Sequence, residues 1–282
     1  MVKAKKQFGQ HWLTSEAALD AIIEASDLKP SDRVLEIGPG TGILTYRLLQ
    51  QAATVLGSEV DDDLCQRLVK QFRRYKNFLL LQGSFLDLDL PHLLTNFPEF
   101  DHPNKVVANI PYNITGPILQ RLLGTISAPH THSYELIVLL VQKEVGERLV
   151  ANPGSKAFGA LSVRVQYLAD CYHVWDVPAR DFSPPPKVDS VVVKIKPRRL
   201  SHPASNPKNL DTLVKVGFAN KRKMLKNNLK SLYAIEVLDQ AFEELNLNPQ
   251  CRGEELGLVD WVRLSDHLHP KPLLSVKSEE QA

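Results

Sequence analysis

The tetrapeptide Asn109-Ile-Pro-Tyr112 contains residue types that can hold a flat amine for reaction. The side-chain oxygen of Asn109 and the backbone carbonyl of Ile110 or Pro111 can accept the two N–H groups of an exocyclic amine. Pro111 restricts the backbone and preorganises these acceptors, while the ring of Tyr112 offers a face for stacking a nucleobase. The motif therefore predicts group transfer to an aromatic amine such as N6 of adenine, by positioning and without a dedicated general base or metal.

A glycine-rich loop, Glu36-Ile-Gly-Pro-Gly-Thr-Gly42, joins a predicted strand to a predicted helix. Its glycines, beginning with Gly38, allow a tight turn and a close approach of the backbone to a ligand. The G-x-G-x-G spacing differs from the G-x-G-x-x-G of dinucleotide sites, and Glu36 would repel a pyrophosphate but suits a cation. The loop therefore predicts a site for S-adenosylmethionine, which carries a sulfonium and an ammonium group.

Two further candidate positions follow the second and third predicted strands. Glu59 lies 21 residues after Gly38, the distance at which a carboxylate commonly accepts the hydroxyls of a ribose. Ser84 stands where methyltransferases of this type commonly have an acid that accepts the adenine amine, and a hydroxyl forms that bond more weakly. Asp87 is the alternative acceptor, and an acid exposed on a loop is the equally simple interpretation of it.

Apolar segments of strand length alternate with segments of helical periodicity between residues 14 and 141. The predicted strands are residues 33–37, 54–58, 78–82, 105–108 and 136–141. The predicted helices are residues 14–25, 43–51, 62–75 and 117–123, and further strands are expected at residues 174–177 and 190–195. This alternation indicates an α/β fold, a Rossmann-like methyltransferase sheet that is mainly parallel and carries helices on both faces.

The pattern changes after residue 195. Residues 196–207 contain three prolines and few apolar side chains, which predicts a linker. The remaining chain has helical periodicity at residues 211–218, 224–232, 237–245 and 260–268. We therefore expect a catalytic domain over residues 1–197, a small all-helical RNA-binding domain over residues 208–270, and a disordered tail over residues 271–282.

The composition, 43% hydrophobic and 23% charged, is that of a globular protein. The chain lacks an apolar run of the roughly 18 residues that a membrane helix needs, and it shows no secretory signal, which predicts a cytoplasmic protein. The cysteines form no C-x-x-C or zinc pattern, so neither a disulfide framework nor a metal site is expected. None of Cys65, Cys171 and Cys251 follows a proline, which argues against a cytosine-C5 methyltransferase.

Charge is distributed unevenly, although the net charge is only +2. Residues 194–230 contain eleven lysines and arginines and one acid, whereas residues 231–266 contain eight acids and two basic residues. A basic block of this kind is either a solvated helix face or a surface that faces a polyanion. Together with a motif directed at adenine, it favours a nucleic acid, and the splayed loop bases of RNA are the targets that can be stacked and read.

Five segments give the chain a nearly full-length resemblance to the ribosomal RNA adenine N6,N6-dimethyltransferases, in particular the bacterial small-subunit (16S) members. They are Gln7-Phe-Gly-Gln-His-Trp-Leu13, Glu36-Ile-Gly-Pro-Gly-Thr-Gly42, Asn109-Ile-Pro-Tyr-Asn-Ile114, Phe182-Ser-Pro-Pro-Pro-Lys-Val-Asp-Ser190 and Phe218-Ala-Asn-Lys-Arg-Lys-Met-Leu-Lys-Asn-Asn-Leu229. The resemblance implies an S-adenosylmethionine-dependent enzyme that dimethylates two adjacent adenosines in a hairpin near the 3′ end of 16S rRNA, during biogenesis of the small ribosomal subunit. It also implies a monomer.

The resemblance further assigns site residues. It implies cofactor contacts from His11, Leu13, Gly38, Glu59, Ser84 and Asn109. It places Phe182 beside Tyr112 as a second aromatic around the target adenine, whereas the residue pattern alone makes Phe182 a core or loop residue. It implies phosphate contacts from Lys221, Arg222, Lys223 and Lys226. His11 stands where many members have asparagine, and Ser84 where most have aspartate.

Three alternatives share parts of this pattern. A 23S rRNA adenine methyltransferase of the antibiotic-resistance type has the same active-site motif, but the helical C-terminal segment favours the small-subunit branch. A non-catalytic assembly or binding factor would retain the fold; the intact motif at residues 109–112 argues against it, and Ser84 argues slightly for it. A DNA adenine-N6 methyltransferase is disfavoured because no target-recognition domain is evident.

Overall fold

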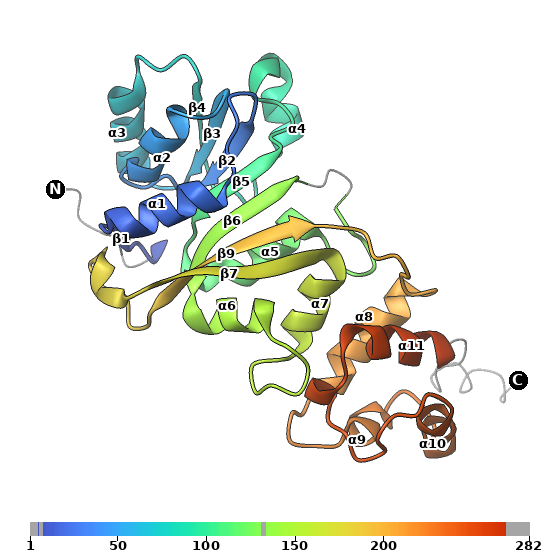
Figure 1. The fold of residues 1–282 in the computed structure, drawn as a ribbon. Coiled ribbons are helices and arrows are strands. Elements are labelled where there is room, and N and C mark those ends of the chain that lie inside the picture. The colour runs from blue at the N-terminus through green and yellow to red at the C-terminus, as the bar shows by residue number, and fades with distance from the viewer. Residues whose placement is uncertain (1–4, 6–7, 131–133, 269–282) are drawn as a thin grey trace, which may run out of the picture. The chain divides into compact units, whose positions relative to one another are not determined.

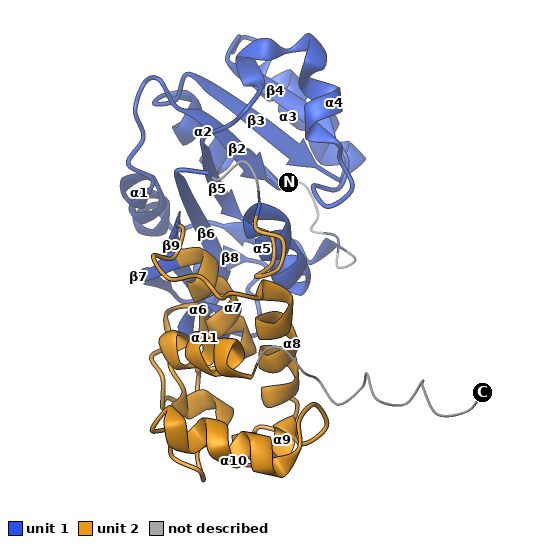
Figure 2. Cartoon of the chain, turned by 90° about the vertical axis from the view of Figure 1, so that its right-hand side faces the viewer, with its two compact units in different colours: residues 1–123, 130–147, 170–198 blue, residues 124–129, 148–169, 199–282 orange. Residues whose placement is uncertain are grey.

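The computed structural model describes residue 5, residues 8–130 and residues 134–268 (Figure 1). The predicted tail, residues 271–282, lies outside the described residues. Contacts group the chain into two compact units (Figure 2). The first contains residues 1–123, 130–147 and 170–198, and the second contains residues 124–129, 148–169 and 199–282. Within the described ranges, no helix combines the length and the apolar character needed to cross a membrane.

A seven-stranded sheet, with strand order β4-β3-β2-β5-β6-β9-β7, forms the centre of the first unit. Its strands are β2 (Arg33–Ile37), β3 (Thr54–Glu59), β4 (Phe78–Gln82), β5 (Lys105–Asn109), β6 (Leu136–Gln142), β7 (Ala169–Val177) and β9 (Ser190–Pro197). Neighbouring strands from β4 to β6 are parallel, and β9 is antiparallel to β6. The predicted α/β sheet is therefore confirmed, with an antiparallel strand beside its parallel part.

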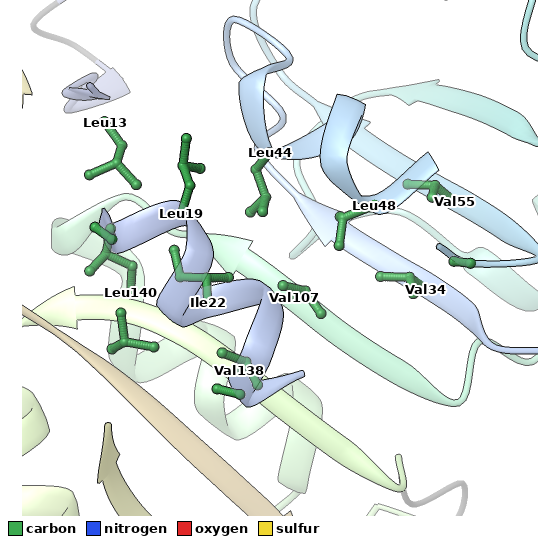
Figure 3. Packing of buried hydrophobic residues seen from close by; sticks show 14 of the residues in the cluster. Leu13, Leu19, Ile22, Val34, Leu44, Leu48, Val55, Val107, Val138 and Leu140 are labelled. Atoms are coloured by element: carbon green, nitrogen blue, oxygen red, sulfur yellow. The ribbon is translucent and has the colours of Figure 1, made fainter. Parts of the chain in front are cut away.

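Helices cover both faces of this sheet, as predicted. One face is covered by α1 (Glu16–Ala25), α2 (Ile43–Leu49) and α3 (Asp62–Phe72). Their apolar side chains, such as Leu19 and Leu48, pack with alternate strand residues such as Val107 in one cluster (Figure 3). The opposite face is covered by α6 (Lys143–Val150), where a Cβ on Gly146 would lie 2.1 Å from Val191 Cγ1. Side chains of adjacent strand residues point to opposite faces, which separates these two layers.

Several elements differ from the sequence prediction. The short α4 (Leu90–Leu93), α6 and α7 (Ala160–Leu168) were not expected. The four residues of α4 are too few to show a period, and α6 starts directly after β6, without a loop that would separate the two elements in the sequence. Strand β7 begins at residue 169, whereas the predicted strand begins at residue 174. The prediction missed the first half of the strand because that half mixes aspartate, cysteine and tyrosine and shows no clear apolar alternation.

A second, two-stranded sheet anchors the segment before α1. Strand β1 (Trp12–Leu13) pairs antiparallel with β8 (Phe182–Ser183), so that Leu13 faces Phe182 in the register. Thr14 adds two bonds, since both its backbone nitrogen and its hydroxyl donate to the Asp181 carbonyl at 2.8 Å. The N-terminal segment is therefore fixed to a loop that is remote in the sequence.

The second unit is helical, as predicted for the C-terminal part of the chain. It contains α7, α8 (Pro207–Gly217), α9 (Leu225–Leu229), α10 (Ile235–Glu244) and α11 (Leu258–His267). Trp261 is fully buried in its core and stacks on Phe218, with ring centroids 5.3 Å apart. Because α7 packs on α8 and α11, residues 148–169 belong to this unit, although the sequence analysis placed them in the domain over residues 1–197.

A buried ion pair joins the amino-terminal ends of β2 and β5. Lys105 Nζ lies 2.8 Å from Asp32 Oδ2, and the two residues are only 4% and 3% exposed. Asn104 also donates to Asp32 at 2.9 Å, and Lys105 donates to the Ser26 carbonyl at 3.0 Å. Burial alone would raise the pKa of Asp32, but the hydrogen bonds from Lys105 and Asn104 outweigh it and hold the pKa below its usual value. The pair thus fixes the two strands at the end opposite to the candidate motifs.

We expect Lys105→Met to lower the free energy of unfolding by about 3–5 kcal/mol, because it leaves the Asp32 carboxylate buried without its counter-charge. Urea denaturation at neutral pH measures this loss. The double variant Asp32→Asn/Lys105→Met removes both charges and should lose less. An equal loss in the two variants would show that the methylene packing of Lys105, and not its charge, determines the effect.

Candidate active site

A cavity of about 270 Å³ opens at the carboxyl ends of β2, β3, β4 and β5, within the first unit. It is lined by the N-terminal segment from Phe8 to Leu13, the glycine loop, the end of β3, the loop after β4 and the motif after β5. Eight of the predicted site residues line it: His11, Leu13, Gly38, Glu59, Ser84, Asn109, Pro111 and Tyr112. Segments distant in the sequence therefore meet at the edge where the parallel strands end.

At two positions the glycine loop has a positive φ that glycine adopts without strain. Gly38 has φ +69°, and a Cβ there would meet no atom within 4 Å, so its backbone is open to a ligand. Gly40 has φ +60°, and a Cβ there would lie 2.9 Å from the Trp12 ring. The first glycine thus allows a ligand to approach the loop, and the second allows the N-terminal segment to pack on it.

Glu59 is held in place at the end of β3 by backbone donors. Its carboxylate accepts from the backbone nitrogens of Gly40 at 3.0 Å, Val60 at 2.9 Å and Asp61 at 3.1 Å. The residue is 5% exposed, and burial raises the pKa of its carboxyl group above the usual value, while these hydrogen bonds oppose the shift. The position therefore offers a fixed acceptor on the cavity wall.

Glu36 is the second acid on the cavity wall and is more deeply buried. It is 1% exposed and accepts a 2.6 Å hydrogen bond from the Thr45 hydroxyl. Burial raises the pKa of Glu36 to about 8. A cation in the cavity would favour the ionised carboxylate, as the sequence analysis expected of a cationic ligand.

Ser84 lies on a loop that is fixed by its neighbours. Its hydroxyl accepts from the Leu86 backbone nitrogen at 3.2 Å. Arg121 of α5 (Thr115–Leu123) donates to the Leu86 carbonyl at 2.9 Å and lies 5.1 Å from the ring centroid of Phe85. Asp87, the alternative acceptor, is not among the described residues that line the cavity. The loop therefore presents Ser84 and Phe85, and not Asp87, to a ligand.

The motif after β5 faces the N-terminal segment. Asn109 Nδ2 donates to the His11 backbone carbonyl at 3.4 Å, which leaves the amide oxygen as the acceptor of the side chain. The Tyr112 hydroxyl forms a hydrogen bond with the Ser190 hydroxyl, and burial raises the pKa of Tyr112. Both polar groups of the motif are therefore oriented by contacts outside it.

Phe182, which the resemblance placed beside Tyr112 around the target adenine, is buried in this structure. Its ring is 3% exposed and belongs to the buried apolar cluster that also contains Leu13 and Leu19. It is absent from the described lining of the cavity. The aromatic ring that the structure does bring to Tyr112 is the imidazole of His11, with ring centroids 6.0 Å apart and an angle of 17° between the planes.

Contacts that no sequence pattern indicated hold the N-terminal segment over the cavity. Asp61, the N-cap residue of α3, accepts from Lys5 Nζ at 2.7 Å and from Gln10 Nε2 at 2.9 Å. Lys5 also contacts Asp63 at 2.7 Å. No local sequence pattern links the acidic run after β3 to a lysine near the N-terminus.

The four predicted phosphate contacts of the second unit differ in their environment. Lys221, Arg222 and Lys223 are exposed on the loop between α8 and α9. Lys226 is paired with Asp239, lies 5.8 Å from the ring centroid of Phe242, and has only 17% of its side chain exposed. The structure therefore groups three of the four cations in one exposed loop. Across the described ranges, no three potential metal ligands are clustered.

Comparisons with known proteins identify a family and several relatives of this chain. The family model described as "Ribosomal RNA adenine dimethylase" matches residues 1–269. A "Ribosomal RNA small subunit methyltransferase A" from Picosynechococcus sp. is 58% identical over 271 residues, which are 96% of this chain and 99% of the relative. The protein of the same name from Nostoc sp. is 58% identical over 268 residues, 95% of this chain and 99% of the relative.

Two solved structures share the fold. A dimethyladenosine transferase from Plasmodium falciparum has a TM-score of 0.75 and 30% identity, and the match covers 90% of this chain and 96% of that one. The 23S rRNA methyltransferase ErmE has a TM-score of 0.71 and 24% identity, over 92% of this chain and 100% of that one. The expected methyltransferase fold is therefore confirmed.

The burial of Glu36 predicts a pH-dependent stability. The folded-state carboxyl keeps its proton up to about pH 8, whereas the ordinary value is 4.5. The folded state therefore binds more protons than the unfolded state across this window, and the contribution of Glu36 to the free energy of unfolding falls as the pH rises through it. We expect Glu36→Gln to lack this fall, so that its stability relative to the unmodified protein increases between about pH 5 and about pH 8. Urea denaturation of the ligand-free proteins measures the difference, and a constant difference would show that Glu36 is ionised throughout.

Proposed function

The chain belongs to the ribosomal RNA adenine dimethylase family and is a methyltransferase, and we propose that it binds S-adenosylmethionine in its cavity. With this cofactor it dimethylates N6 of two adjacent adenosines in a hairpin near the 3′ end of 16S rRNA. The observation that carries the proposal is the meeting of the glycine loop and the Asn109 motif in one cavity. The substrate is proposed from the names of relatives that match over nearly their whole length.

The residues of the cavity fit the cofactor. Gly38 leaves room beside the loop, Glu59 offers fixed acceptor oxygens for a ribose, and the Ser84 hydroxyl lies on the loop expected beside the adenine. Glu36 is a buried acid whose ionisation a cationic ligand would favour. When bound, S-adenosylmethionine supplies an electrophilic methyl group on its sulfonium.

The protein then positions the target amine. Asn109 Oδ1 accepts one N–H of adenine N6, while its Nδ2 donates to the His11 carbonyl and so orients the amide. The Pro111 carbonyl already accepts from the Ile114 nitrogen at 3.3 Å, which favours the Ile110 carbonyl as the second acceptor. With both N–H groups held in the plane of the base, the nitrogen lone pair is directed out of the plane, toward the methyl donor.

Two of the alternatives lose support. The similarity to the 23S rRNA methyltransferase ErmE is 24% in identity and extends to the fold alone, whereas the small-subunit relatives are 58% identical. A non-catalytic binding factor would not need the oriented amide of Asn109 or the two acids buried at the cavity.

We propose that the enzyme acts as a monomer and requires no metal.

The function is tested with the purified protein, labelled S-adenosylmethionine and small-subunit particles from a strain that lacks the modification. The RNA is digested to nucleosides, which are separated. Recovery of N6,N6-dimethyladenosine from small-subunit RNA is expected. Label in large-subunit RNA would assign the protein to the resistance type, and cofactor binding without labelled RNA would support a binding factor.

We expect Asn109→Ala to lower methyl transfer at saturating cofactor by about 10²–10³-fold, the range for loss of one preorganised polar contact at a reacting group. Single-turnover rates on the same particles measure this loss. Calorimetric titration with cofactor is the control, because Asn109 also lines the cofactor cavity. A rate that recovers fully at high cofactor concentration would assign Asn109 to cofactor binding alone.

A matched pair of lysine variants tests the RNA surface of the second unit. Lys221→Gln removes an exposed cation and should reduce the slope of log affinity against log salt by about 0.7–0.9. Lys226→Gln should leave this slope unchanged, because its ammonium is already paired with Asp239. Binding of a 16S rRNA fragment is measured between about 50 and about 200 mM salt. Equal slopes for Lys221→Gln and the unmodified protein would remove this loop from the RNA contact.

A further inference from the structure

The helix that begins beside the cavity carries a dense set of exposed cations. Helix α3 and the turn after it, residues 64–77, contain five lysines and arginines and no acid. All five side chains are exposed, and we refer to them together as the α3 basic surface: Arg67, Lys70, Arg73, Arg74 and Lys76. Helix α3 is the outermost of the three helices on its face of the sheet, next to the edge strand β4 (Figure 1).

The charge of this surface is not balanced by neighbouring acids. Among the residues that the structure describes, none of the five side chains is paired with an aspartate or glutamate. On the adjacent helix α2, by contrast, Arg47 contacts Glu16 and lies 3.0 Å from Asp20. A helix dipole favours cations in the last turn, which accounts for Lys70 but not for Arg67 in the middle of α3. The α3 basic surface therefore carries positive charge that neither ion pairs nor the helix itself explain.

Other polar groups on α3 lie beside these cations. A shallow depression along the helix is lined by five polar side chains, Asp63, Gln66, Arg67, Lys70 and Gln71. The acid among them, Asp63, is itself paired with Lys5 at 2.7 Å. Amide, guanidinium and ammonium groups are the donors that proteins direct at the phosphate and sugar oxygens of nucleic acids. The depression thus has the donor set of a site for a nucleic-acid backbone.

The turn after α3 is held in place by backbone contacts. The Val55 nitrogen donates to the Asn77 carbonyl at 2.8 Å, and Asn77 Nδ2 donates to the carbonyls of Leu49 and Ala52 at 3.3 Å each. The cations that follow the last turn of α3 are therefore presented by a fixed main chain. Binding of a polyanion there would order side chains but little backbone, which limits its entropic cost.

The α3 basic surface extends away from the cavity. Asp61, the N-cap residue of α3, contacts the segment over the cavity, whereas Asn77 lies beside the start of β3, at the other end of the strand. With 11 residues, α3 rises about 16 Å between these points. A base in the cavity and a phosphate at the end of α3 therefore belong to separate positions of a bound RNA.

We propose that the α3 basic surface binds the phosphate backbone of small-subunit rRNA outside the target hairpin. The proposal rests on the proposed function, since it adds a second contact with that substrate. Charge complementarity carries it, because RNA is the polyanion that this function brings to the protein and unpaired cations are the groups that release its counterions. Such a contact is independent of base identity, so it strengthens binding and leaves the selection of adenosine to the cavity.

Three single substitutions in the first unit form a matched set. Arg67→Gln and Arg74→Gln each remove one charge of the surface, and Lys29→Gln removes an exposed charge elsewhere. Binding to small-subunit particles that lack the modification is measured between about 50 and about 200 mM salt. We expect each arginine variant to reduce the slope of log affinity against log salt by about 0.7–0.9, and the double variant by about 1.4–1.8. Lys29→Gln should keep the slope of the unmodified protein.

Two further measurements locate the contact. A fragment of 16S rRNA that contains the target hairpin alone should show the same slope with all variants, because it lacks the RNA that the surface binds. In the double variant, KM for the particles should rise, while kcat at saturating particles and the dissociation constant of the cofactor stay unchanged. A variant that is merely misfolded would lower kcat and cofactor binding as well.

The proposal is overturned if both arginine variants keep the slope of the unmodified protein, or if Lys29→Gln changes it equally, which would indicate a general effect of net charge. Loss of affinity without a change in slope would assign the surface to a protein of the particle, and an equal change with the hairpin fragment would assign it to the target hairpin. Each of these results contradicts the proposal. An unmodified enzyme that binds the particles without methylating them would instead refute the proposed function, while the slopes would still test the surface.

Discussion

The parallel pairing of β2 with β5 is the contact on which the site depends. In the sheet, β2 lies between β3 and β5, so the chain runs to one side through β3 and β4 and then returns to the other side of β2. Ligands of open α/β sheets bind where the strand order reverses in this way, at the carboxyl ends of the strands. The loop after β2 and the motif after β5 are neighbours for this reason, and the Asp32–Lys105 pair fixes the same two strands at their other ends.

The cavity carries an energetic cost that the rest of the fold offsets. Glu36 and Glu59 are 1% and 5% exposed, and burial raises the pKa of both carboxyl groups. A protein selected for stability alone would bury apolar groups there, since an isolated buried carboxylate is strongly unfavourable. The proposed cofactor, which has positive charge and hydroxyl groups, accounts for their placement at the cavity, and the apolar cluster below α1, α2 and α3 contributes the compensating stability.

Features encoded by near neighbours in the sequence were predictable, and those created by distant pairing were not. The strands, the glycine loop and Glu59 follow from local periodicity and spacing. The structure places the glycine loop and Glu59 in one cavity at the carboxyl ends of the strands. By contrast, the burial of Phe182 depends on the pairing of β1 with β8, two strands that lie far apart in the sequence. The environment of Lys226 likewise depends on Asp239 in another helix. Sequence and resemblance supplied the residue types, but only the assembled fold shows which of them face the cavity.

The orientation of Asn109 has a consequence for how the proposed reaction ends. Its amide nitrogen donates to the His11 carbonyl, and its amide oxygen is the group that can accept from the substrate amine. An unmodified adenine brings two N–H groups to the acceptors, a monomethylated one brings one, and a dimethylated one brings none. Each transfer therefore removes a donor from the enclosed site, and an acceptor left without a partner disfavours the complex. The finished nucleotide is the form that the site holds least well, which couples completion of the modification to dissociation of the RNA.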